Sequence, residues 1–119
     1  MDNNKKMRIY HNPRCSKSRM TLALLISKTS EFEIIDYLKN PLKFEEIKLI
    51  IEKLNIPPIE LVRTNENIWK ESYKGKQLTD KEIIIAMIDN PKLIERPIVT
   101  TNKKAIIGRP PENVLSLFD

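Results

Sequence analysis

The stretch MRIYHNPRCSKSRMTLALLISKTSEFEIIDYL, residues 7–38, decides the fold of this chain. Residues 7–11 are rich in β-branched and aromatic side chains and stop at an Asn-Pro pair, which predicts a short strand. Residues 16–28 contain no proline or glycine and predict a helix, and residues 32–38 predict a second strand. Strand, helix and strand in this order form a βαβ unit, so we expect the two strands to be parallel.

The middle of the chain predicts a block of helices. A first helix is indicated by apolar side chains that recur at helical spacing, namely Phe44, Ile47, Ile50, Ile51 and Leu54. The pair Pro57-Pro58 ends this helix, and Pro58 can begin a short helix that runs to Arg63. Thr79 and Glu82 have the spacing of a capping box, which predicts that a further helix begins there.

The last part of the chain predicts a hairpin and a closing helix. Residues 97–101 and 103–108 have the pattern of two short strands joined by a tight turn, and Pro111 with Glu112 suits the start of a helix. A mixed four-stranded sheet with helices on its faces satisfies the whole order of elements with short connections. The sequence therefore predicts an α/β fold. Its length of 119 residues, without repeat or linker, predicts a single domain over residues 1–119.

The composition excludes several classes of protein. One cysteine cannot form an internal disulfide, so a disulfide-stapled secreted fold is excluded. The first ten residues hold no apolar stretch that could act as a signal peptide, and Lys28 interrupts the apolar run after Arg19 before it could cross a membrane. The net charge of +5 is spread beside glutamates, so nucleic-acid binding is not indicated. We expect a cytoplasmic, reducing setting in which the thiol stays free.

The segment YHNPRCSKSR holds the only cysteine and the only histidine of the chain. The strand–loop–helix order places Cys15 at a helix N-terminus, where unpaired amides and the helix dipole favour an anion. Such a position, with cations nearby, lowers the pKa of a cysteine from about 8.5 to roughly 3.5–7.5. A lone cysteine is more often a small buried apolar side chain, but these polar, cationic flanks favour a reactive thiolate. His11 can contribute through its charge or through a hydrogen bond.

The spacing within this segment excludes two kinds of chemistry. A dithiol loop has the pattern Cys-x-x-Cys, and here Ser18 fills the second position. Any oxidised or substrate-bound form of Cys15 therefore needs a thiol from outside the chain. One cysteine and one histidine are too few nitrogen and sulfur ligands, so no metal site is predicted.

The same segment resembles the active-site loop of the glutaredoxin-linked arsenate reductase family, whose members share a His-Asn-Pro-x-Cys-x-x-Ser-Arg pattern. The likeness continues through FEIIDYLKNP, LVRTNE, ERPIV and IGRPPE, and it is nearest to the short arsenate reductase-like branch. The resemblance implies a thioredoxin-like fold with an inserted helical block and a cis proline at position 97. It also implies a set of site residues: Cys15 as the nucleophile on arsenate, His11 beside it, and Arg63, Arg96 and Arg109 holding the oxyanion.

The resemblance further implies partners and a reaction. Arsenate would be the substrate, glutathione the co-substrate and glutaredoxin the protein that restores the free thiol of Cys15, with no bound cofactor. Two other functions stay open at this point. One is a redox-sensing Spx-type regulator, which has a related fold and binds RNA polymerase, although typical members carry a second cysteine where this chain has Ser18. The other is a general glutathione-dependent thiol exchange protein.

Overall fold

The structure is a computed structural model that describes residues 7–118. The chain divides into two units, each with its own buried apolar side chains. The sheet unit consists of Met1–Asn40 and Arg96–Asp119, and the helical unit consists of Pro41–Glu95. The expectation of one domain over residues 1–119 stays a prediction.

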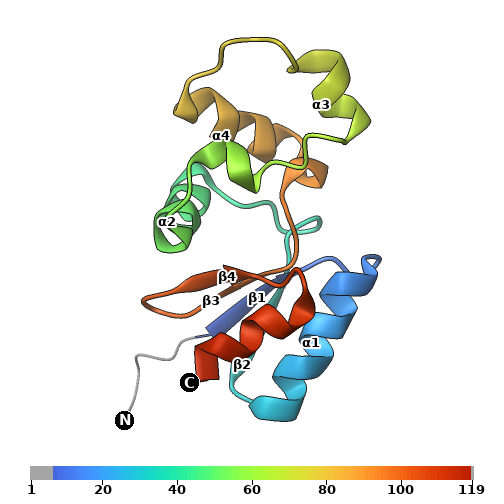
Figure 1. Cartoon of the computed structure of the whole chain (residues 1–119), viewed down its shortest axis with the longest axis vertical. Coiled ribbons are helices and arrows are strands. Elements are labelled where there is room, and N and C mark those ends of the chain that lie inside the picture. Colours follow the sequence, from blue (N-terminus) through green and yellow to red (C-terminus); the bar gives the residue numbers. More distant parts are fainter. Residues whose placement is uncertain (1–6, 119) are drawn as a thin grey trace. The chain divides into compact units, whose positions relative to one another are not determined.

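The sheet unit contains the four strands and two of the helices of the described chain (Figure 1). Its elements are β1 (Met7–His11), α1 (Ser16–Lys28), β2 (Phe32–Asp36), β3 (Ile98–Thr100), β4 (Ala105–Ile107) and the 3₁₀ helix η4 (Pro111–Phe118). The strand order is β2-β1-β3-β4, with β1 parallel to β2 and antiparallel to β3, and β3 antiparallel to β4. This confirms the mixed four-stranded sheet, the βαβ unit and the hairpin.

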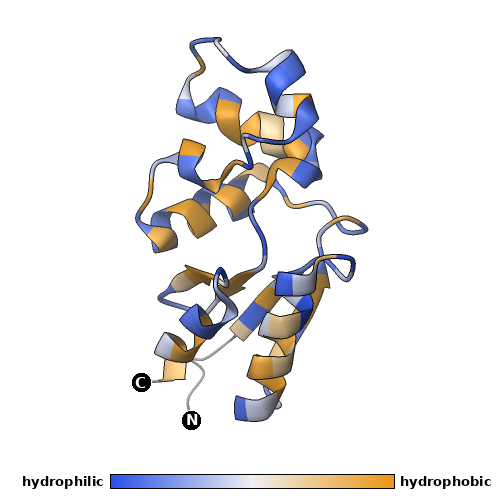
Figure 2. Ribbon diagram, turned by 45° about the vertical axis from the view of Figure 1, so that its right-hand side comes forward, coloured by the Kyte–Doolittle hydropathy of each residue, from blue (hydrophilic) through white to orange (hydrophobic). Residues whose placement is uncertain are grey.

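The core of the sheet unit lies between the sheet and its two helices. Met7 and Ile9 of β1 and Val99 of β3 pack with Leu25 of α1 and Val114 of η4. Figure 2 shows that the two ends of α1 are hydrophilic and that the turns between them are mostly hydrophobic, which suits these middle turns to the core. The core therefore fixes the body of α1 against the sheet and leaves its polar first turn at the end of β1.

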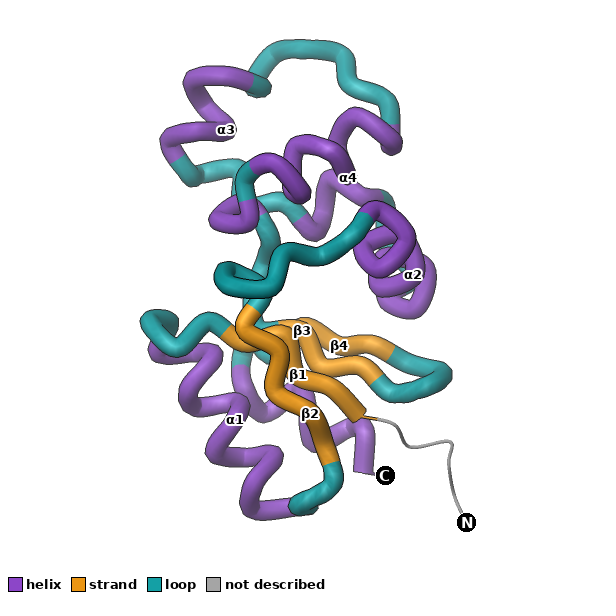
Figure 3. Tube along the Cα trace, turned by 180° about the vertical axis from the view of Figure 1, so that it is seen from behind, coloured by secondary structure: helices purple, strands orange, loops and turns teal. Residues whose placement is uncertain are grey.

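Some features of the sheet unit differ from the predicted ones. The two strands of the hairpin are shorter than predicted, Ile98–Thr100 and Ala105–Ile107 instead of residues 97–101 and 103–108. The second strand ends at Asp36 instead of residue 38, because Asp36 Oδ1 accepts a hydrogen bond of 3.1 Å from the backbone N–H of Leu38 and turns the chain. The closing segment begins at Pro111 as predicted but is a 3₁₀ helix. Figure 3 shows the four strands side by side, with both short strands of the hairpin on one side of β1.

The helical unit confirms the predicted block of helices. Its elements are α2 (Phe44–Leu54), the 3₁₀ helix η2 (Pro58–Leu61), α3 (Asn67–Ser72), α4 (Asp80–Asp89) and the 3₁₀ helix η3 (Pro91–Leu93). The capping box is present, since Thr79 Oγ1 accepts from the N–H of Glu82 and the Glu82 carboxylate accepts from the N–H of Thr79. Within the part of the chain that the structure describes, every helix is too short or too polar to span a bilayer.

The helical unit also contains a bridge between two extended residues, Val62 and Ile94, that was not predicted. The helix that starts at Pro58 ends at Leu61 and not at Arg63, because Val62 forms an isolated antiparallel bridge with Ile94. The N–H of Arg63 donates to the carbonyl of Leu93 at 2.7 Å, which completes this pairing. The bridge joins residues more than thirty positions apart, so local sequence pattern does not reveal it.

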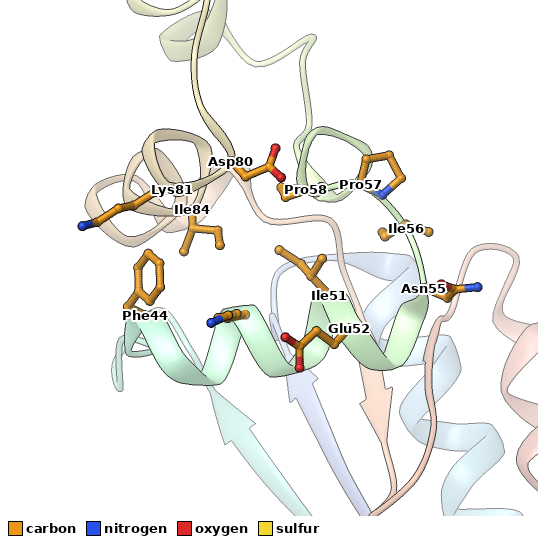
Figure 4. A pocket seen from close by; sticks show the side chains of 11 residues that line it. Phe44, Ile51, Glu52, Asn55, Ile56, Pro57, Pro58, Asp80, Lys81 and Ile84 are labelled. Atoms are coloured by element: carbon orange, nitrogen blue, oxygen red, sulfur yellow. The ribbon is translucent and has the colours of Figure 1, made fainter.

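The helical unit also contains a pocket of about 790 Å³ beside α2 and the start of α4 (Figure 4). Phe44, Ile51 and Ile84 give it apolar walls. Charged side chains of both signs, among them Glu52 and Lys81, also line it.

Candidate active site

Cys15 occupies the N-cap of α1, as the sequence predicted. Three hydrogen bonds, each donated by a backbone N–H group, close the loop that carries Cys15. The N–H of Cys15 donates to the carbonyl of Asn12 at 3.0 Å, the N–H of Arg14 donates to the Asn12 side-chain oxygen at 3.0 Å, and the N–H of Arg19 donates to the carbonyl of Cys15 at 3.0 Å. This turn lets the chain leave β1 and enter α1 at once, with the thiol partly exposed.

The surroundings of Cys15 lower the pKa of its thiol, in the predicted direction. Burial alone would raise it, but three groups outweigh burial: the backbone N–H of Ser18, the side chain of Arg96 and the backbone N–H of Lys17. Arg96 acts both as a hydrogen-bond donor and as a positive charge. The thiolate is therefore stabilised by the first turn of α1 and by a cation from a distant part of the sequence.

A second arginine also contacts the thiol. Arg109 Nη2 lies 3.5 Å from Cys15 Sγ, and Arg109 Nε donates to the carbonyl of Arg96 at 2.8 Å. The sheet unit thus brings together Cys15, Arg96 and Arg109, which lie far apart in the sequence. The peptide bond before Pro97 is cis, as the resemblance implied, and the bond between Arg109 and Pro110 is also cis, which was not predicted.

Gly108 sets the position of Arg109. Its N–H donates to the carbonyl of Pro97 at 2.9 Å, and its carbonyl accepts a hydrogen bond from Thr21 Oγ1 of α1 at 3.3 Å. A Cβ at this position would lie 2.6 Å from Thr21 Oγ1, so only glycine fits without a shift of α1 or of the chain. This close approach places the next residue, Arg109, beside the N-terminus of α1.

His11 belongs to a buried hydrogen-bond network that contains Ser18. His11 Nδ1 lies 2.6 Å from Ser18 Oγ, and the same hydroxyl accepts from the N–H of Asn12 at 3.0 Å. Burial lowers the pKa of His11, the charge of Asp36 opposes this, and the charge of Arg19 adds to it, so the surroundings favour the neutral imidazole.

Through this network His11 holds the residue whose N–H stabilises the Cys15 thiolate. From the sequence, Ser18 was interpreted only as the residue in place of a second cysteine, and the network was not predicted. The signal was its place three residues after Cys15, one helical turn along α1. A catalytic role for His11 stays a prediction.

Arg63 lies in the helical unit and binds two carboxylates there. Its Nη1 donates to Glu95 Oε1 at 2.9 Å and its Nε donates to Glu66 Oε2 at 3.3 Å. Burial lowers the pKa of Arg63, but the two carboxylates outweigh burial and raise it. Neither Glu66 nor Glu95 was predicted as a partner of Arg63. A part for Arg63 in holding an oxyanion stays a prediction.

The described residues hold no group of three or more histidine, cysteine, aspartate or glutamate side chains suited to bind a metal ion. What the sheet unit offers instead is a thiol of lowered pKa with two guanidinium groups beside it. Such a site can attack an electrophile and hold an anion at the same place.

Comparisons with known proteins agree with this fold. Residues 10–117 match the model of the ArsC family, and the chain belongs to that family. It is 46% identical over 115 residues to the uncharacterized protein YfgD of Escherichia coli, covering 95% of this chain and 97% of that one. It is 42% identical to the arsenate reductase of Haemophilus influenzae, covering 92% and 97%.

A solved structure shows the same fold. The arsenate reductase from Vibrio cholerae has 44% sequence identity and a TM-score of 0.89, covering 94% of this chain and 97% of that one. The fold is therefore thioredoxin-like, with a mixed four-stranded sheet and helices inserted between β2 and β3.

Proposed function

We propose that this protein is an oxidoreductase that reduces arsenate to arsenite, with Cys15 as the nucleophile and glutathione and glutaredoxin as the source of electrons. Membership of the ArsC family, with relatives named arsenate reductase at 39% and 42% identity, supports arsenate as the substrate. The observation that carries the proposal is the thiol of lowered pKa at the N-cap of α1, with Arg109 Nη2 at 3.5 Å.

In the first step the Cys15 thiolate attacks arsenic. A sulfur–arsenic bond forms and one oxygen of arsenate leaves as water after taking up protons. Arg96 and Arg109 are the donors beside the thiol, and they offset the negative charge that the oxyanion brings there. Fixed guanidinium groups suit this task because each can hold two oxygens of an oxyanion through parallel hydrogen bonds.

The second step needs an outside thiol because Cys15 is the only cysteine. A glutathione thiolate adds to the adduct, a sulfur–sulfur bond forms, and the electron pair of the sulfur–arsenic bond stays on arsenic, which leaves as arsenite. Glutaredoxin then exchanges its own thiol into the mixed disulfide and releases the Cys15 thiolate. No bound cofactor is part of this scheme.

The roles of the remaining predicted residues follow from their contacts. His11 positions Ser18, and through it the N–H that faces the thiolate. Arg63 is assigned a secondary place in oxyanion binding, because Glu66 and Glu95 already balance its charge.

The test is an arsenate-reduction assay with glutathione and glutaredoxin, in which the arsenite formed by wild type is compared with that formed by Cys15→Ser. We expect arsenite from wild type and none above background from the variant. A wild type that forms no arsenite but deglutathionylates a peptide would replace the proposal with general thiol exchange. If wild type shows neither activity but captures RNA polymerase, the function is that of a redox-sensing Spx-type regulator.

A further inference from the structure

Two of the segments that build the site carry charges of one sign only. Residues 12–30 and 97–111 contain no aspartate or glutamate. They contain seven cations, namely Arg14, Lys17, Arg19, Lys28, Lys103, Lys104 and Arg109. A surface of this kind attracts anions, and the cations nearest the thiol decide which anion reaches it.

Two of these cations flank Cys15 and are not used within the fold. Arg14 precedes Cys15 directly and Lys17 lies in the first turn of α1, and both are exposed. Within residues 7–118 neither side chain has a hydrogen-bond or ion-pair partner. The other cations near the thiol are engaged, since Arg19 donates to the carbonyl of Pro13 at 2.9 Å and Arg109 contacts Cys15 Sγ.

We propose that Arg14 and Lys17 select the thiol co-substrate by binding the carboxylates of a glutathione-type peptide while its sulfur reacts with Cys15. This inference rests on the proposed function, in which glutathione supplies electrons. Glutathione carries one carboxylate at each end and its sulfur between them. The chain carries two exposed cations close to Cys15 in the sequence, Arg14 before it and Lys17 after it, so the number and sign of the charges match.

The size of this cationic pair favours a small anion over a protein surface. A stable protein interface covers about 800 Å² on each partner, with some 20–30 residues. Among residues 7–118, Arg14 and Lys17 are the two cations close to Cys15 in the sequence whose side chains have no partner. Glutathione carries two carboxylates, so the numbers agree. Arg14 can also bind a carboxylate through two parallel hydrogen bonds.

The selection can be measured without arsenate. The Cys15 thiolate attacks one sulfur of glutathione disulfide, a Cys15–glutathione disulfide forms, and one glutathione leaves as a thiolate with the electron pair of the broken bond. The same exchange runs with bis(2-hydroxyethyl) disulfide, which is neutral, and with cystamine, which carries two positive charges. The ratio of rates between these disulfides reports charge selection, because any change in the nucleophilicity of Cys15 affects all of them together.

The test measures second-order rate constants of mixed-disulfide formation on the full chain by mass spectrometry. The variants are Arg14→Gln, Lys17→Gln and the double variant. The matched control is Lys28→Gln, since Lys28 is exposed at the far end of α1, about 16 Å from Lys17 at 1.5 Å per residue. That distance exceeds the screening length of about 8 Å at 0.15 M salt.

We expect wild type to prefer glutathione disulfide over the neutral disulfide, and cystamine to react most slowly. Each single variant should lower the preference about two- to five-fold and the double variant about ten-fold at low salt, with Lys28→Gln unchanged. A preference that is unchanged in the double variant would overturn the inference. The inference would also be overturned if the double variant slowed only the reduction of the mixed disulfide by glutaredoxin. Arg14 and Lys17 would then bind glutaredoxin and not the small peptide. If the preference falls as expected while wild type forms no arsenite, the inference stands and the proposed function fails.

Discussion

Replacing Arg96 with glutamine should raise the pKa of Cys15 by up to about one unit. Arg96 stabilises the thiolate both by a hydrogen bond and by its charge. A hydrogen bond to a charged group contributes about 1.5–3 kcal/mol, and one pKa unit corresponds to about 1.4 kcal/mol. Because Cys15 is partly exposed, solvent screens the interaction and the lower end of this range applies. Glutamine removes the charge and can offer only a neutral amide donor, so about one unit is the upper end of the expected shift.

The measurement is titration of the ultraviolet absorbance of the thiolate in wild type and in Arg96→Gln. Lys17→Gln is the matched control, because it removes an exposed cation from the first turn of α1 while keeping the backbone N–H that faces the thiol. We expect a shift below about 0.3 units in the control, since exposed charges are heavily screened. An unchanged pKa in Arg96→Gln, or equal shifts in both variants, would show that the first turn of α1 holds the thiolate without Arg96.

Three further changes test the rest of the site. Arg96→Ala should lower kcat/KM for arsenate by about 10²–10³ with glutathione and glutaredoxin saturating, and Lys17→Ala should lower it much less, because Arg96 lies beside the developing charge while Lys17 is exposed to solvent. The stability of wild type should fall as the pH drops below 6.5, because burial holds the pKa of His11 under that unfolded value and the unfolded chain then binds the extra proton. The free energy of unfolding falls until the pH passes the pKa of His11 in the folded protein. In His11→Gln this part of the fall should be absent, which chemical denaturation at pH 7 and pH 5 measures. Gly108→Ala should lower the free energy of unfolding by about 1–3 kcal/mol, because its Cβ would meet Thr21 Oγ1 at 2.6 Å.

Each of these predictions has its own control. Equal losses of kcat/KM in Arg96→Ala and Lys17→Ala would contradict a direct contact of Arg96 with the oxyanion. The same pH dependence in wild type and His11→Gln would assign the acid sensitivity to other groups. In the double variant Gly108→Ala/Thr21→Ala, the loss of stability should be smaller than the sum of the two single losses, since the two Thr21 atoms in conflict are gone and only Pro97 Cγ, at 3.0 Å, remains. Additive losses would mean that the cost of Gly108→Ala arises elsewhere.

Many elements of both units could be predicted because their signals are local. The bounds of β1, α1 and α2 follow from a strand pattern, a run without proline or glycine and an apolar period. The end of β2 carried a local signal that was missed, because an aspartate two residues before Leu38 can turn the chain with its side chain. The place of Cys15 at the N-cap followed directly from the order of β1 and α1.

The contacts of the arginines could not be predicted in full, because they depend on residues distant in sequence. The match to family positions named Arg96 and Arg109, and the structure places both at the thiol. Nothing local indicated that Glu95 binds Arg63 across more than thirty residues, or that Gly108 packs on Thr21. Such contacts arise from tertiary packing, which overrides what a short window of sequence can show.

Ser18, fully buried three residues after Cys15, also decides what oxidants do to this protein. A sulfenic acid formed at Cys15 by peroxide has no thiol in its own chain with which to condense. It is either capped by a small thiol from the surroundings or oxidised further to a sulfinic acid, which thiols do not reverse. The lasting activity of this protein under oxidative stress therefore depends on the thiol pool of its cell.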